Sequence, residues 1–287
     1  MVATALGEYV TLTTTWGGID RSWVQYVPLS INPYFPRPVV LALHGDYGTA
    51  QNLITSMAWG EIAEAEPNGF YVLMPNGGAQ LLAGYTWNSY VFDGSGVDDM
   101  GFVLSLIDTL NTTYPVDRRR VYFFGHSKGA QMCTTIALRY PHLVAALGHI
   151  KGGWATDQKP GCDQYFQEYM PVPVWTWRGN LENQVTAGVP RDVQDQHQLE
   201  YWTTRLGCNP TPIEQDFLIQ GTDQRSGSLT ADDGSPVTRA CYTQIYTGGS
   251  AEYRFTVETE AENDPNHSYQ LGTARRFWND LCKRSNR

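Results

Sequence analysis

A serine lies between two glycines in residues 125–129, which read Gly-His-Ser-Lys-Gly. The residues before it, 121–124, form a short apolar run, and residues 130–140 place apolar side chains at helical spacing. Glycines on both sides allow a sharp turn between a strand and a helix, so that the hydroxyl of Ser127 projects above the sheet edge. This order of strand, turn and helix predicts a nucleophile elbow, in which Ser127 attacks an electrophilic carbon.

A serine hydroxyl needs a general base, and that base needs an acid to orient it. When the serine occupies an elbow, the acid and the histidine follow it in that order, each after a later strand. Glu182 follows the predicted strand at 172–177 and is the only carboxylate there before Asp192. We therefore predict Glu182 as the acid. Asp192 is the alternative, although its position suits the start of a helix, where aspartate is a common cap.

The candidate base is the last histidine of the chain, His267. It lies between the last predicted strand, 253–257, and the last predicted helix, 273–282. The base of a serine nucleophile of this kind comes from that region. The predicted catalytic triad is therefore Ser127, Glu182 and His267.

Acyl chemistry also needs backbone N–H groups directed at the negative charge that develops on the carbonyl oxygen. One such donor is expected to be the amide of Lys128, directly after the nucleophile. The second should come from residues 44–48, which follow the first buried strand. The amide of Asp46 is preferred, with Tyr47 as the alternative. His44 is expected either to brace the loop or to be a satisfied core histidine.

Short apolar runs alternate with helical patterns along the chain. The runs at 38–43 and 70–74 are continuously apolar, as in strands that are covered on both faces. Alternating strands and helices predict an α/β fold with a mostly parallel sheet and helices on both of its faces. Further strands are predicted at 121–124, 143–150, 172–177 and 253–257, and helices at 51–65, 99–110, 130–140, 192–206 and 273–282.

The N-terminal residues carry a different pattern. Residues 8–14 and 21–28 mix β-forming and polar residues around Gly17 and Gly18, which predicts an antiparallel hairpin at a sheet edge. Residues 207–250 are polar, with weak strand signals, and are interpreted as an excursion from the core. Without a visible linker or repeat, residues 1–287 are expected to form a single domain.

Composition limits the range of partners. The formal net charge of −9 and the pI of about 5.1 argue against nucleic acid or an anionic membrane. The basic cluster at 118–120 directly precedes a strand and is interpreted as a solvated strand entrance. No apolar run reaches the ~18 residues of a membrane helix, and no signal peptide is visible. The histidines show no metal-binding spacing, and no cofactor or metal is expected.

Several segments together resemble a known group of enzymes. They are Val-Val-Leu-Ala-Leu-His-Gly at 39–45, Val-Asp-Asp-Met-Gly-Phe at 97–102, and Tyr-Pro-Val-Asp-Arg-Arg-Arg-Val-Tyr at 114–122, which leads into the elbow. A helix that ends in Gly-Cys at 207–208 also fits. Residues 20–285 resemble α/β-hydrolase esterases, namely polyhydroxybutyrate-depolymerase-like proteins and carbohydrate-esterase-family-one feruloyl and acetylxylan esterases.

This resemblance implies a serine carboxylesterase of the α/β-hydrolase fold that works through an acyl-enzyme. Feruloyl, acetyl-polysaccharide and polyester substrates are all compatible with it. The alternatives are a serine peptidase or thioesterase on the same fold, or a binding protein without catalytic activity.

The chain departs from the family's pattern at three positions near the predicted site. Residues 178–182 read Arg-Gly-Asn-Leu-Glu where the family has His-Gly-x-x-Asp, so the acid is a glutamate. Pro-Asn-His replaces Gly-Gly-His at 265–267, and Lys128 is unusual in the elbow. These departures leave the identity of the ester substrate open.

The five cysteines carry an expectation about location. Cys133 lies on the apolar side of the elbow helix and is expected to be a buried thiol, while Cys162, Cys208, Cys241 and Cys282 are assigned to loops or their vicinity. In the family a disulfide at the Gly-Cys helix end is common, which favours a bridge between Cys208 and Cys241. Such a bridge implies an oxidising compartment and hence a secreted or extracytoplasmic protein.

Two tryptophans are candidates for substrate contact. Trp87 and Trp154 lie on segments expected at the carboxyl edge of the sheet, where ligands bind in folds of this class. Their rings would suit a phenolic acyl group, a sugar or a polyester chain. The alternative is that both tryptophans pack in the core or in a lid.

Overall fold

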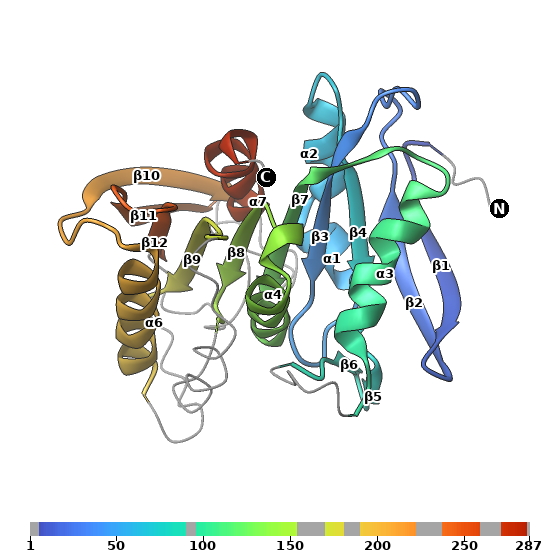
Figure 1. Ribbon diagram of the computed structural model, residues 1–287, viewed down its shortest axis with the longest axis horizontal. Helices are drawn as coiled ribbons and strands as arrows, with labels where there is room; N and C mark the ends of the chain where they lie inside the picture. The colour runs from blue at the N-terminus through green and yellow to red at the C-terminus, as the bar shows by residue number, and fades with distance from the viewer. Residues whose placement is uncertain are drawn as a thin grey trace.

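One continuous sheet of ten strands forms the centre of the computed structural model, which describes residues 6–89, 96–153, 170–180, 190–221, 237–258 and 271–285 (Figure 1). The strand order is β1-β2-β4-β3-β7-β8-β9-β12-β11-β10. The central strands from β4 to β12 are parallel, and those at both edges are antiparallel. The mostly parallel sheet expected from the sequence is confirmed. The strands are β1 (Tyr9–Trp16), β2 (Ile19–Tyr26), β3 (Arg37–Leu43), β4 (Tyr71–Pro75), β7 (Val116–His126), β8 (Ala146–Ile150), β9 (Val174–Gly179), β10 (Ile213–Gly221), β11 (Val237–Tyr246) and β12 (Tyr253–Glu258).

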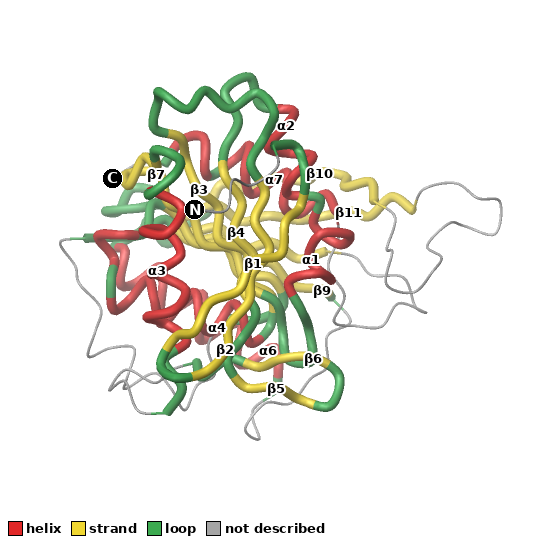
Figure 2. Tube along the Cα trace, turned by 90° about the vertical axis from the view of Figure 1, so that its right-hand side faces the viewer, coloured by secondary structure: helices red, strands yellow, loops and turns green. Residues whose placement is uncertain are grey.

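Helices cover both faces of this sheet, as Figure 2 shows from the side. Side chains from α3, α4 and α6 join one core cluster, and those from α1, α2 and α7 join the other. None of the helices described combines the length and apolar character that a bilayer crossing requires. The helices are α1 (Ala50–Met57), α2 (Trp59–Ala65), α3 (Asp99–Asn111), α4 (Lys128–Arg139), α6 (Arg191–Leu206) and α7 (Leu271–Asp280).

The apolar run of β3 shows why the central strands lack polar positions. All its residues after Arg37 are buried. Val39 and Leu41 pack into the cluster on one face of the sheet, whereas Val40 and Ala42 pack into the cluster on the other. A strand covered on both faces needs apolar side chains at odd and even positions alike.

The N-terminal hairpin is present as predicted. β1 and β2 pair antiparallel, and Trp16 faces Ile19 across a two-residue turn. Gly17 and Gly18 occupy this turn with φ values of 60° and 82°. Positive φ at both central positions is typical of the tight turn whose twist matches that of a hairpin, and glycine adopts it without strain.

The helix expected over residues 51–65 is divided in two at Ala58. This residue has φ 52° and ψ 38°, so its backbone is left-handed. Its amide donates to the carbonyl oxygen of Ile54 at 3.3 Å, and its own carbonyl accepts from the Ile62 amide at 3.1 Å. Ala58 therefore closes α1 and opens α2, and the bend between them leaves both Met57 and Trp59 fully buried.

The polar segment 207–250 contributes more to the fold than the sequence suggests. β10 pairs with β11, and β11 pairs with β12, so this segment extends the central sheet by two antiparallel strands. The interpretation of this segment as an excursion with weak strand signals was too cautious, because edge strands carry few of the continuous apolar runs that mark central strands.

The predicted bridge between Cys208 and Cys241 is wrong, because no disulfide joins these two residues in the described part of the chain. Cys208 packs against the cluster of α3, α4 and α6, whereas Cys241 belongs to the cluster on the opposite face of the sheet. The assignment of Cys241 and Cys282 to loops also changes, since Cys241 lies within β11 and Cys282 begins a short 3-10 helix, η3 (Cys282–Arg284). Cys133 is a buried thiol, as expected.

Candidate active site

Ser127 lies at the turn between β7 and α4, in a backbone conformation that non-glycine residues rarely adopt. Its φ is 50° and its ψ is −117°. Such a conformation costs about 1–3 kcal/mol and persists only where the surrounding structure enforces it. The Ser127 amide donates to the carbonyl oxygen of Ile150 at 2.9 Å, which ties the turn to the end of β8. The side chain is half-buried, and the sharp turn from strand to helix expected from the sequence is present.

Glycines let three backbones converge on this turn. A Cβ atom on Gly152 would lie 2.5 Å from the carbonyl oxygen of Ser127. One on Gly125 would overlap the backbone of Gly129, and one on Gly129 would overlap the backbone of Leu43 at the end of β3. Larger side chains at these positions would therefore push α4 away from the sheet, and the serine with it.

The amide of Lys128, the first expected donor, belongs to the first residue of α4. No described residue accepts a hydrogen bond from this amide. The first N–H groups of a helix have no partner within it, and the helix dipole makes this end attractive to negative charge. The position suits an oxyanion donor, and that role stays a prediction.

The loop after β3 approaches the serine from the other side. A Cβ atom on Gly45 would lie 3.0 Å from the Cβ of Ser127. The amide of Tyr47 already donates to the carbonyl oxygen of Tyr85 at 3.1 Å, whereas no residue within the described ranges accepts from the Asp46 amide. These contacts favour Asp46 over Tyr47 as the second donor, a role that likewise stays a prediction.

His44 is buried beneath this loop and connects it to its neighbours. Its Nε2 accepts from the amide of Gly77 at 3.1 Å, and its Nδ1 donates to the carbonyl oxygen of Gly45 at 2.7 Å. One accepting and one donating nitrogen is the pattern of a neutral imidazole. Burial lowers the pKa of His44 to about 4, which keeps the ring neutral near pH 7. These contacts agree with the bracing role expected for His44.

Trp87 supports the same loop from below and is only 2% exposed. Its indole N–H donates to the carbonyl oxygen of His44 at 2.7 Å, and the two ring centroids lie 4.9 Å apart. A side chain this deeply buried presents no ring face to a substrate in this conformation. The burial of Trp87 favours the alternative of core packing over substrate contact, and a role in positioning the loop stays a prediction.

The variant Trp87→Phe tests this role. It leaves the buried carbonyl of His44 without its donor, a loss that typically costs about 1–3 kcal/mol. We expect a lower melting temperature and a similar reduction of kcat for p-nitrophenyl acetate and for bulky aromatic esters, measured by steady-state kinetics. A KM that rises only for the bulky esters, with unchanged stability, would restore Trp87 as a substrate contact.

A buried ion pair anchors the segment that carries Trp87. Arg21 in β2 and Asp99 in α3 lie 2.5 Å apart, with side chains 1% and 0% exposed. Asp99 also accepts from the amide of Asn88 at 2.7 Å, and Arg21 donates to the carbonyl oxygen of Asn76 at 3.1 Å. The pair thus holds both ends of the segment between Asn76 and Asn88, which packs beneath the loop after β3.

Glu182, His267 and Trp154 lie outside the described residues, so their roles stay predictions. The strands that precede the predicted acid and base in the sequence are described. β9 ends at Gly179 and β12 ends at Glu258, and these two residues pair in register. The segments that contain the predicted acid and base therefore follow adjacent strands, at the carboxyl edge that also carries the serine.

Two further carboxylates can be compared with Glu182. Asp192 is exposed in the first turn of α6, a position where aspartate is common without any catalytic role. Glu258, which the sequence analysis did not consider, is 1% exposed, and its Oε2 accepts from the indole N–H of Trp177 at 2.9 Å. The sequence signal that could have identified Glu258 is its position as a charged residue at the end of a mostly buried strand.

The sequence analysis names Tyr47 only as a possible backbone donor, but its side chain also lies on the surface. Tyr47 has a positive φ of 61°, and its side chain is 61% exposed. It belongs to the loop that approaches Ser127, and two short strands that form a second hairpin, β5 (Ala79–Leu81) and β6 (Gly84–Thr86), support this loop through Tyr85. Among the described aromatic residues of this loop system, Tyr47 is thus available to a substrate where Trp87 is not.

A second buried histidine, His149, should make the stability of the protein depend on pH. His149 in β8 is fully buried, and burial lowers its pKa to about 3. Unfolded, it would titrate near pH 6.5. Because the unfolded chain binds a proton at His149 at a higher pH than the folded chain does, the free energy of unfolding should fall as the pH drops from about 6.5 towards 3.

Urea unfolding between pH 7.5 and 5 should show this dependence of the free energy of unfolding on pH. The variant His149→Gln should reduce the dependence, and the exposed control His142→Gln should retain it. An unchanged pH dependence in His149→Gln would contradict the assignment.

A serine turn at the carboxyl edge of a mostly parallel sheet, with helices on both faces, defines an α/β-hydrolase. An acetyl xylan esterase from Aspergillus awamori has a similar fold, with a TM-score of 0.64 and 15% sequence identity over 94% of this chain and 98% of that protein.

The sequence comparisons specify the group of esterases. Residues 22–158 match the protein family described as Esterase PHB depolymerase. A bifunctional acetylxylan esterase/xylanase of Neocallimastix patriciarum is 26% identical over 62% of this chain, and a poly(3-hydroxyalkanoate) depolymerase C of Paucimonas lemoignei is 30% identical over 40% of it. The chain spans 24% and 28% of the lengths of these two relatives. It thus resembles the polyhydroxybutyrate-depolymerase-like and acetylxylan esterases, as its motifs indicated.

Proposed function

We propose that this protein is a serine carboxylesterase that hydrolyses its substrate through an acyl-enzyme. The hydroxyl of Ser127 attacks the ester carbonyl while His267 accepts its proton, and Glu182 orients the imidazole and stabilises its positive charge. The amides of Lys128 and Asp46 stabilise the charge on the carbonyl oxygen. The alcohol leaves with the proton from His267, and water then releases the carboxylic acid by the reverse sequence of proton transfers.

The backbone of Ser127 is the single observation that carries this proposal. A serine with φ 50° and ψ −117° stores strain that a simple glycine turn would avoid. This serine directly precedes the first turn of α4, where unsatisfied amides favour negative charge. A binding protein without catalytic activity needs neither the strained serine nor these amides.

Acetyl esters on a polysaccharide are the favoured substrate class. The relative of Neocallimastix patriciarum and the Aspergillus awamori protein of similar fold both carry acetyl xylan esterase in their names. A polyester is the second candidate, because the matched family is described as a PHB depolymerase. Tyr47, with its exposed ring, offers a stacking surface to a sugar or a polymer chain. Feruloyl esters remain a third candidate through the motif resemblance.

A substrate panel tests the proposal and ranks these classes. We expect hydrolysis of p-nitrophenyl acetate and release of acetate from acetylated xylan, with lower rates on methyl ferulate and polyhydroxybutyrate. An aminoacyl amide and an acyl thioester test for the peptidase and thioesterase alternatives. Ser127→Ala serves as the blank for every substrate. Activity confined to the amide or the thioester would contradict the esterase assignment.

A location outside the cytoplasm belongs to the same proposal. A polysaccharide or polyester supplied from the surroundings is too large to enter the cell, so an enzyme that hydrolyses such a polymer must meet it outside. The described cysteines do not support this location, since the bridge expected between Cys208 and Cys241 is not formed, and Cys162 lies outside the described residues. Fractionation of the native host, with ester hydrolysis assayed in the medium and in the cell lysate, tests it directly.

A further inference from the structure

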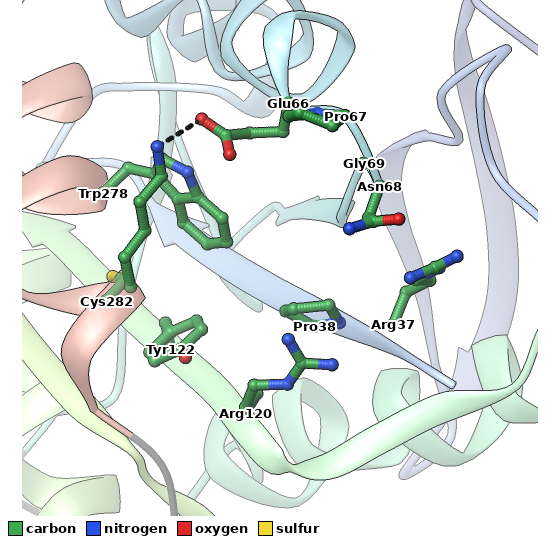
Figure 3. A pocket seen from close by; sticks show the side chains of 11 residues that line it. Arg37, Pro38, Glu66, Pro67, Asn68, Gly69, Arg120, Tyr122, Trp278 and Cys282 are labelled. Atoms are coloured by element: carbon green, nitrogen blue, oxygen red, sulfur yellow. Dashed lines mark ion pairs between the residues drawn. The ribbon is translucent and has the colours of Figure 1, made fainter. Parts of the chain in front are cut away.

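A basic pocket lies at the sheet edge opposite the serine. It has a volume of about 340 Å³ (Figure 3). Its lining includes residues from the start of β3, from β7 and from the C-terminal helix η3. An adjoining cavity of about 370 Å³ shares Arg120 and Lys283 with it. Neither cavity is lined by Ser127 or by the loop after β3.

The residues that line these cavities carry a positive excess, whereas the whole chain is acidic. Three cations, Arg37, Arg120 and Lys283, line the first cavity together with one carboxylate, Glu66. The second adds Arg119, Arg284 and the carboxylate of Asp117, so that five cations face two carboxylates. The protein as a whole has a formal net charge of −9. A local positive excess in an acidic protein attracts anions to one place on its surface.

Not all of these cations are neutralised by their neighbours. Lys283 lies 2.7 Å from Glu66, and Arg120 lies 2.7 Å from Asp117. Arg37 has no ion pair with any described carboxylate, and its buried Nε has no hydrogen-bond partner in the part of the chain that the structure describes. In Figure 3 the guanidinium groups of Arg37 and Arg120 and the side-chain amide of Asn68 border the same space.

A second donor in the pocket also lacks a partner. The indole nitrogen of Trp278 forms no hydrogen bond with any described residue, although this side chain is only 5% exposed. Buried N–H groups are usually paired, because leaving one without a partner costs about 1–3 kcal/mol. Arg37 and Trp278, which both line this positively charged pocket, thus each carry a donor without a partner among the described residues.

We propose that this pocket binds an oxyanion group, either a phosphate or the carboxylate of an acidic sugar. The planar guanidinium groups of Arg37 and Arg120 can each donate two parallel hydrogen bonds to such a group, and Asn68 adds a neutral donor. The volume is at the lower end of the range for small-molecule sites, so the ligand is of the size of a single sugar or a small phosphate. This site is separate from the proposed ester hydrolysis and does not depend on it.

Isothermal titration calorimetry at constant ionic strength tests the site, with inorganic phosphate, glucuronate and uncharged glucose as probes. We expect saturable binding of phosphate or glucuronate and none of glucose, and the tighter of the two anions identifies the natural group. Arg37→Gln should weaken anion binding about tenfold, as expected for the loss of a hydrogen bond to a charged group. Hydrolysis of p-nitrophenyl acetate should stay unchanged in this variant, so the result does not depend on the esterase.

Arg118→Gln is the matched control. Arg118 lies in β7, the strand that carries Arg120, is half-exposed and lines neither cavity, so its loss should change anion affinity less than twofold. Arg120→Gln provides a second variant should Arg37→Gln fail to fold, as judged by circular dichroism. The proposal is overturned if the wild-type protein shows no saturable heat with either anion. Equal losses of affinity in the pocket variant and in Arg118→Gln would also overturn it, since they indicate diffuse attraction to surface charge.

Discussion

Replacement of Ser127 by alanine is expected to lower kcat/KM for p-nitrophenyl acetate by ~10⁴-fold or more, because the members of a catalytic triad act as a unit. Alanine at this position keeps the strained backbone, so the melting temperature should change little. Initial rates over a range of substrate concentrations, together with thermal unfolding, separate the loss of the nucleophile from a loss of folding.

Ser127→Gly is a matched variant that the backbone geometry makes informative. Glycine adopts a φ of 50° without strain, so this variant should be as inactive as Ser127→Ala but more stable. Relief of the strain could add about 1–3 kcal/mol to the free energy of unfolding, measured by urea denaturation. Substantial activity in either variant would remove Ser127 from the role of nucleophile. A glycine variant no more stable than the alanine variant would contradict the strained turn.

The second large effect is expected at Glu182. The variant Glu182→Gln removes the charge that orients the imidazole and stabilises it when protonated, and kcat should fall by ~10³–10⁴-fold. Asp192→Asn should change kcat by less than a factor of about two, since Asp192 is exposed in the first turn of α6. Both variants preserve side-chain size, so kcat reports the lost charge.

Glu258→Gln belongs in the same experiment as a third variant. Glu258 is a buried carboxylate at the end of β12, paired in register with the end of β9. A loss of ~10³-fold in this variant, with Glu182→Gln near wild-type activity, would move the acid from the loop after β9 to β12. A large loss of kcat confined to Asp192→Asn would instead identify Asp192, the alternative from the sequence, as the acid.

The sequence predicted those features that depend on neighbouring residues. The elbow at 125–129 and the turn at Gly17 and Gly18 are set by glycines at fixed positions within a few residues. The apolar run of β3 indicates a buried strand, because its own composition excludes exposure on either face. Local chemistry thus sufficed for the parallel core and for the position of the candidate nucleophile.

Features that depend on distant contacts were not predictable in this way. Trp87 was assigned to the substrate because its segment lies at the correct edge, but its hydrogen bond to His44 spans 43 positions of sequence. The pair of Arg21 and Asp99 joins β2 to α3 across 78 positions, so no pattern within either element indicates it. Cysteine pairing failed for the same reason, since the face on which Cys241 packs depends on the register of β11.

Peptide mapping by mass spectrometry after reaction with a fluorophosphonate probe tests the central claim most directly. Such probes react with an activated serine and leave a stable adduct on its oxygen. We expect one adduct per protein molecule, located on Ser127 in the peptide that contains residues 125–129, and no adduct in Ser127→Ala. An adduct on another serine, or the absence of any adduct while the wild-type protein hydrolyses esters, would contradict the account.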